Sequence, residues 1–303
     1  MTLGQKIIVT VGSYIITFIT ICMIFKYDIS FMLTSRNIDR KYGNMTENSY
    51  FVEDHFKFVD NYDKAELHSK EDIINSIYYL INTGSTYAKR YCAKDYFDCY
   101  KDMEALTNDA NLLSILNNYV HPYNSFETLM FNFDDRVVDI EIKHSYSKEN
   151  IKAINEKVDE VINSMDLNSK STRDKIKIIH DYIINNTEYD SLKTNNIKDN
   201  TYKSNTAYGV MIEGKGICSG YSDTMKIFLD KLNIVNYKVS NDEHIWNVVM
   251  LDEGWLHLDL TWDDPISEKN ITRDNYFLID NATLKLLDDD EHHYNKDYIP
   301  EVK

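Results

Sequence analysis

The chain has 303 residues, of which 33 are basic and 49 acidic, giving a formal net charge of −16. This acidity argues against binding to a nucleic-acid backbone, which needs clustered Lys and Arg. With 43% apolar and 13% aromatic residues the chain can bury a core, so a disordered protein is excluded, and its length fits one large domain or two modest ones.

The first predicted element is an uncharged, apolar run at residues 7–25, between Lys6 and Lys26. A helix of this length is about 28 Å long, close to the roughly 30 Å hydrocarbon core of a bilayer. The run has no polar face and no small-residue cleavage site, which argues against a buried core helix and a cleaved signal peptide. We therefore predict a short tail at residues 1–6 followed by an uncleaved transmembrane helix.

The charges that flank this run bear on its orientation. Basic residues after the run outnumber those before it, which by itself favours a cytoplasmic C-terminal part. Long domains, however, translocate largely regardless of flanking charge. We predict a single-pass protein of the cell membrane, with the membrane as a partner of the N-terminal helix and the large domain outside the cell.

Residues 27–120 are predicted to form a mainly helical juxtamembrane region, with one helix starting at Ser69 and stopping at Gly84. Cys92 and Cys99 lie in this region. If their segment is helical, their Cα atoms are about 10.5 Å apart, too far for a disulfide, whereas a loop would allow one in an oxidising compartment. The spacing leaves both alternatives open.

A second region, predicted at residues 121–303, begins with a change from helical to alternating apolar periodicity. Apolar and other residues alternate in residues 129–133 and 138–142, on either side of a turn at Asp134-Asp135. This pattern indicates a pair of strands with one solvent-exposed face. Helices are predicted at residues 148–165 and from Ser171 onward. His180 lies beside the apolar face of the second helix, and we interpret it as a structural histidine.

The residues with unusual backbone and packing demands gather after residue 208. Gly214 and Gly216 suit a sharp turn, after which a helix is predicted from Cys218 to Leu232. The N–H groups and dipole at a helix N-terminus stabilise a thiolate, the nucleophilic form of cysteine. The alternative, a buried structural cysteine, is common among free cysteines.

Two strands after this helix offer partners for Cys218. A two-residue turn at Asp252-Glu253 would pair Leu251 with Gly254, and therefore His244 with Thr261. Asp259 would then lie on the same face as His244, within reach of it. A three-residue loop would put them on opposite faces. In the first case His244 would act as the general base of Cys218, and Asp259 would orient the imidazole.

Two other histidine-bearing segments offer rival interpretations. His257 is a second candidate base, but its side chain would point alongside Asp259 rather than across at it. The acidic run at residues 288–293, which ends in two histidines, could bind a metal. We interpret it as a solvated segment because it lacks a ligand spacing, and we predict neither a metal nor a cofactor.

The motifs of this second region occur in an order typical of one family. G-K-G-x-C-x-G-Y at residues 214–221, H-x-W-N at 244–247, L-D-x-T-W-D-D-P at 258–265 and Y-F-L at 276–278 resemble the bacterial transglutaminase-like domain, over roughly residues 125–295. The resemblance implies an α+β, papain-like fold in which the helix bearing the cysteine packs on an antiparallel sheet. It also implies a catalytic triad of Cys218, His244 and Asp259. Ser219 stands where many relatives carry Gln, which leaves substrate preference open.

The predicted function is that of a membrane-anchored thiol enzyme at the cell surface, which transfers acyl groups from amide or peptide bonds of a protein or peptide substrate. Transfer to an amine, as in cross-linking, and transfer to water, as in a protease or amidase, both stay open. The alternative is a catalytically inactive module that keeps the fold for binding. A third reading makes residues 284–293 a metal-regulated element.

Overall fold

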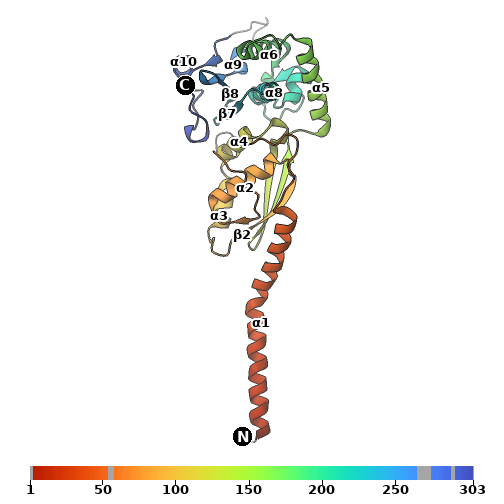
Figure 1. The fold of residues 1–303 in the computed structure, drawn as a ribbon, viewed down its shortest axis with the longest axis vertical. Coiled ribbons are helices and arrows are strands. Elements are labelled where there is room, and N and C mark those ends of the chain that lie inside the picture. The colour runs from red at the N-terminus through yellow and green to blue at the C-terminus, as the bar shows by residue number, and fades with distance from the viewer. Residues whose placement is uncertain (1–2, 54–57, 265–273, 288–290, 303) are drawn as a thin grey trace.

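The computed structural model describes residues 3–53, 58–264, 274–287 and 291–302. It is an α+β structure with one long helix leading into a folded body (Figure 1). The helices are α1 (Leu3–Tyr42), α2 (Lys70–Asn82), α3 (Cys99–Thr107), α4 (Ala110–Tyr119), α5 (Lys148–Ser164), α6 (Thr172–Asn186), α7 (Ser191–Asn195), α8 (Cys218–Lys231), α9 (Leu260–Asp263) and α10 (Asn281–Leu287), with shorter helical turns at Pro122–Asn124, Gly209–Glu213 and Lys296–Tyr298.

The first sheet has four strands in the order β1-β2-β4-β3. The predicted strand pair is confirmed: β3 and β4 are antiparallel. Because Asp134 pairs with Val137, their turn is at Asp135-Arg136, one residue later than predicted, and Asp135 adopts a positive φ of 53°. The strands are β1 (Glu66–Leu67), β2 (Tyr87–Cys92), β3 (Phe126–Asp134) and β4 (Val137–His144).

The second sheet is antiparallel throughout, in the order β10-β9-β8-β7. Helix α8 packs on one of its faces and α4 on the other, as the buried clusters on the two faces show. The predicted α+β core, with the cysteine-bearing helix on an antiparallel sheet, is therefore confirmed. The strands are β7 (Asn236–Ser240), β8 (Ile245–Leu251), β9 (Gly254–Leu258) and β10 (Phe277–Ile279), and a small parallel pair joins β5 (Glu188–Tyr189) to β6 (Lys215–Gly216).

Side chains on both faces of the second sheet are buried, in two different cores. Val249 and Leu256 belong to the core formed with α5, α6 and α8. Val248 and Trp255 belong to the core that also contains α2, α4 and the first sheet. We call the part built on the first sheet and the part built on the second sheet the two halves of the body. Burial of each large apolar side chain contributes about 1.5–3 kcal/mol, so the two halves stabilise each other through the core that they share.

Strands from both sides of residue 121 contribute to the first sheet. β2 pairs with β4 from Tyr87 to Tyr91, so the segments at 66–92 and 126–144 form one unit. The chain end also joins the body, because Val302 forms an isolated β-bridge with Trp255. The division into regions at residues 27–120 and 121–303 stays a prediction.

Helix α1 corrects the N-terminal part of the predicted fold class. No helix in the described part of the chain is long and apolar enough to cross a membrane. The predicted transmembrane helix at residues 7–25, the single-pass membrane localisation and the membrane as a partner are therefore wrong on this finding.

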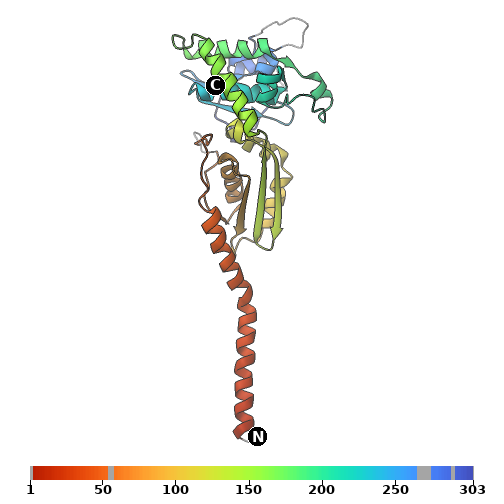
Figure 2. The ribbon, with the colours of Figure 1, turned by 90° about the vertical axis from the view of Figure 1, so that its right-hand side faces the viewer.

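Helix α1 is one continuous helix through and beyond the apolar run, in which side chains are described at residues 14–21. Residues 7–13 and 22–25 lie outside the described side chains. The helix does not end with the apolar run but continues to Tyr42, and its last turns pack on the body through buried Ile38 and Tyr42 (Figure 2).

The segment with Cys92 and Cys99 is a loop between the end of β2 and the start of α3. The two cysteines form a disulfide, with Cα atoms 6.1 Å apart. The loop alternative is therefore the one that the structure adopts.

Candidate active site

Cys218 is the first residue of α8, and a closely packed loop sets its position. Gly214 ends the preceding turn with a left-handed φ of 67°. Gly220 lies so close to the loop that a Cβ atom there would meet the carbonyl oxygen of Ser204 at 2.3 Å. These glycines let the loop approach the first turn of α8, and the half-buried thiol of Cys218 faces a cleft.

The turn between β8 and β9 has the two-residue length that the site requires. Leu251 pairs with Gly254, as predicted, and Asn247 pairs with Leu258. The further pair between His244 and Thr261 does not form, because β9 ends at Leu258. Asp259 instead caps α9, where its Oδ1 accepts hydrogen bonds from the backbone N–H groups of Thr261 and Trp262.

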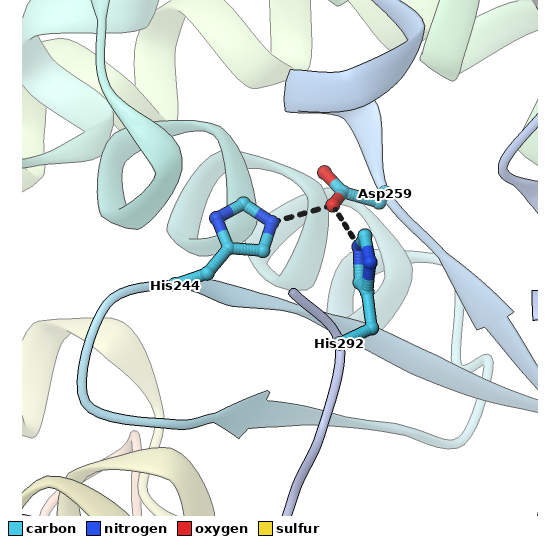
Figure 3. Close-up of side chains that lie close together, drawn as sticks. All are labelled: His244, Asp259 and His292. Carbon is cyan, nitrogen blue, oxygen red and sulfur yellow. Dashed lines mark hydrogen bonds and ion pairs between the residues drawn. The ribbon is translucent and has the colours of Figure 1, made fainter. Parts of the chain in front are cut away.

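His244 and Asp259 meet across the end of this hairpin. The Nε2 atom of His244 lies 2.5 Å from Oδ2 of Asp259 (Figure 3). Burial alone would lower the pKa of His244, but the charge and hydrogen bond of Asp259 outweigh it and raise that pKa to about 10. Burial would raise the pKa of Asp259, yet His244 and His292 hold it well below its usual value.

Cys218 and His244 both line the same cleft. The interaction with Cys218 adds to that with Asp259 in raising the pKa of the His244 ring. Because Nε2 of His244 is taken by Asp259, Nδ1 is the ring atom left for the thiol. The structure thus places His244, the residue before β8, in direct contact with Asp259, the cap of α9, and places Cys218, the first residue of α8, in the same cleft as His244.

The site contains a residue that the sequence analysis missed. Nε2 of His292 lies 2.8 Å from the same Oδ2 of Asp259, and the His292 side chain is 1% exposed (Figure 3). The interpretation of residues 288–293 as a solvated segment is therefore wrong for His292; residues 288–290 lie outside the described residues. No local pattern around His292 signals this placement, which depends on how the C-terminal segment returns to the sheet.

The same three side chains bear on metal binding. Ligand atoms of His244, Asp259 and His292 all lie within 4.8 Å of one another, so the set could hold a divalent cation. To do so, both imidazoles would have to exchange their hydrogen bonds with Asp259 for bonds to the ion. Those hydrogen bonds account for the arrangement without a metal, and its absence stays a prediction.

The other two histidines singled out in the sequence have structural partners. Nδ1 of His257 accepts a hydrogen bond from Nε1–H of Trp246 at 3.0 Å, and its Nε2 lies 3.1 Å from Oδ1 of Asn281. Burial lowers the pKa of His257 to about 4, so the ring is neutral at pH 7, and both of its nitrogens have partners other than Cys218. His180 is fully buried between Asp181 and Asp263, in agreement with a structural role.

A polar cleft of about 420 Å³ opens at Cys218 and His244. Its walls come from both halves of the body: α4 and the start of β3 on one side, α8 and the loop before β8 on the other. Much of the lining is hydroxyl, amide and carboxylate, including Ser114, Asn118 and Glu243. This polar lining differs from the mostly apolar lining of small-molecule pockets.

Comparison with protein families agrees with this geometry. Residues 159–260 match the family model of the transglutaminase-like superfamily, a range that contains Cys218, His244 and Asp259. This part of the chain is therefore similar to transglutaminase-like domains. The search of curated proteins gives no match.

Two solved structures are similar in fold. One, described as a TGase, is 19% identical over 62% of this chain and 54% of its own, with a TM-score of 0.35. The other, a candidate cysteine protease from Cytophaga hutchinsonii, is 15% identical over 44% of this chain and 61% of its own, with a TM-score of 0.28. The chain thus spans less than two thirds of each, and the likeness concerns the fold alone.

Proposed function

We propose that this protein is a cysteine enzyme of transglutaminase-like type, which transfers acyl groups from amide or peptide bonds of protein or peptide substrates. The observation that carries the proposal is that His244, held by the carboxylate of Asp259, lines the same cleft as the thiol of Cys218. Each group has the chemistry that its role requires.

The reaction begins from a Cys218 thiolate beside a protonated His244, the pair that forms when the thiol proton passes to Nδ1 of the ring. The thiolate attacks the carbonyl carbon, and the resulting oxyanion is stabilised by the backbone N–H of Cys218, which has no intrahelical partner at the first position of α8. The C–N bond then breaks, and His244 returns the proton to the leaving amine or ammonia. A thioester on Cys218 remains.

A second nucleophile resolves the thioester. Water or an amine gives its proton to His244 and attacks the carbonyl, and the sulfur leaves as a thiolate. Asp259 stays ionised throughout and holds Nε2–H of His244, which keeps Nδ1 directed at the sulfur. Both nucleophiles can be tested in one experiment.

The test incubates the full chain with a glutamine-containing peptide and a primary amine, followed by mass spectrometry. Gain of the amine identifies cross-linking chemistry, gain of water with loss of ammonia identifies an amidase, and backbone cleavage identifies a protease. Cys218→Ala and His244→Ala should abolish the product, whereas His293→Ala, an exposed neighbour of the site, should not. Absence of any product, or an equal yield from Cys218→Ala, would contradict the proposal and favour a binding module.

A further inference from the structure

Asp259 is shared by two imidazoles that come from distant parts of the chain. His244 precedes β8, whereas His292 lies in the segment after α10, and both point at the same carboxylate oxygen (Figure 3). An ionised carboxylate only accepts hydrogen bonds, so each ring nitrogen must donate. With Oδ1 taken by two backbone N–H groups, the carboxylate is held at both oxygens.

The backbone on either side of His292 is tied to His244 through one side chain. Nδ2 of Asn241 donates to the carbonyl oxygens of Glu291 and His293, at 2.8 and 3.0 Å. Its Oδ1 accepts from the backbone N–H of His244 at 2.7 Å. A single amide thus fixes the C-terminal segment and the start of β8 relative to each other.

Aromatic rings enclose the His292 imidazole. It stacks on Tyr276 with ring centres 5.2 Å apart, and it meets the edge of Trp246 at 4.9 Å. Trp262 lies at 5.6 Å. Because these rings exclude water, the hydrogen bond to Asp259 lies in a region of low dielectric constant, where such a bond is strong.

We propose that His292 is a positioning residue, whose Nε2–H orients the carboxylate of Asp259 toward His244 and so keeps the imidazole directed at Cys218. The proposal rests on the proposed function, since it assigns His292 a part in activating that thiol. It also makes the C-terminal segment, which lies outside the matched residues 159–260, part of the active site.

Two substitutions separate the hydrogen bond from the ring packing. His292→Phe keeps a ring against Tyr276 and Trp246 but has no donor, whereas His292→Gln keeps an N–H donor near the Nε2 position and loses the ring. The readouts are the rate constant for alkylation of Cys218 by iodoacetamide, and kcat and KM for the amide substrate. His293→Phe, one residue along and exposed, is the matched control.

We expect His292→Phe to lower the alkylation rate and kcat by about tenfold, the effect of losing one hydrogen bond to a charged group, with KM within about twofold. His292→Gln should retain rates within about threefold of wild type, and His293→Phe should match wild type. Should His292→Phe fail to fold, judged by its thermal melt, the rates of His292→Gln decide alone. Wild-type rates for His292→Phe, or a His292→Gln variant with rates lowered about tenfold, would overturn the proposal.

The proposed function is checked in the same series. His244→Ala should slow alkylation of Cys218 regardless of the result for the His292 variants. If wild type and His244→Ala alkylate equally fast, the thiol is not activated and the proposed function fails. If only the His292 variants behave unexpectedly, the positioning role fails and the proposed function stands.

Discussion

Asp259 keeps its negative charge in a nearly water-free place because N–H groups surround it. Its side chain is 2% exposed, and an isolated carboxylate there would become protonated. Two backbone N–H groups at the start of α9 and two imidazoles replace the lost water. The cost of burial is thereby offset, and the charge is available to stabilise a protonated His244.

The stability of the protein should therefore depend on pH above neutrality. The pKa of His244 is about 10 in the folded state and near 6.5 in the unfolded state. The folded state binds more protons between these values, so the stabilisation is fully present below about pH 6.5 and is lost as pH rises through 10. The free energy of unfolding should fall with a slope of at most about 1.4 kcal/mol per pH unit for this one proton.

Urea denaturation between pH 6 and 10.5 measures this slope. His244→Gln should flatten the curve, whereas His293→Gln, which lies outside the pair, should leave it unchanged. A wild-type curve with no fall between pH 7 and 10, or an equal slope in His244→Gln, would show that the imidazole and Asp259 do not form a charged pair.

Single residues differ in how well the sequence predicts them. The contact between His244 and Asp259 could be predicted from the hairpin that joins them, and the place of Cys218 at a helix start from the glycines before it; their catalytic roles stay a prediction. His292 could not be predicted, since its role depends on where a tail without regular structure crosses the sheet. Long-range placement of that kind leaves no periodicity in the sequence.

At the scale of elements, the length of one turn decides whether a site exists. The two-residue connection between β8 and β9 keeps the alternation in register, and a single added residue would move Asp259 away from His244. The sequence analysis predicted this turn, but it also predicted that β9 continues to Thr261, whereas the strand ends at Leu258. Asp259 leaves the strand because its carboxylate captures the first N–H groups of α9, which favours a helix cap over a further pair.

The disulfide between Cys92 and Cys99 is an element-scale feature that can be tested separately. It closes a short loop between β2 and α3, away from the cleft. From the loop length, its removal should cost about 2 kcal/mol of unfolding free energy.

Cys92→Ser with Cys99→Ser should lower the melting temperature by several degrees, measured by circular dichroism. The alkylation rate of Cys218 should stay at the wild-type value in the native protein. A changed rate would show that the disulfide acts on the site, and an unchanged melting temperature would show that it does not constrain the fold.

At the scale of the whole molecule, the two halves of the body share a core. Tyr237 and Val248 of the second sheet pack in the same cluster as Leu116 of α4 and Ile140 of the first sheet. The α+β class and the core around Cys218 could be predicted from motifs and periodicity. The apolar run near the N-terminus led to the prediction of a membrane span because the sequence does not indicate that the helix continues to Tyr42 and packs on β2.

This shared core predicts where the chain can be shortened. A fragment beginning at residue 28 keeps Ile38, Tyr42 and Phe31, which packs on Tyr91, and should unfold cooperatively. A fragment beginning at residue 121 loses β2 and α4, which exposes apolar surface on both sheets, and should aggregate or melt without a sharp transition.

Calorimetry and size-exclusion chromatography of the two fragments measure this difference. The outcome that contradicts a shared core is a monomeric fragment 121–303 with a sharp transition at the melting temperature of the longer fragment.

The bridge between Val302 and Trp255 has a practical consequence for anyone handling this protein. Both partners are buried in the core that underlies the second sheet. An affinity tag or fluorescent fusion appended directly after Val302 would strain that contact and, through the same segment, the seating of His292. The N-terminal end of α1 projects far from the body and offers the safer attachment point (Figure 1).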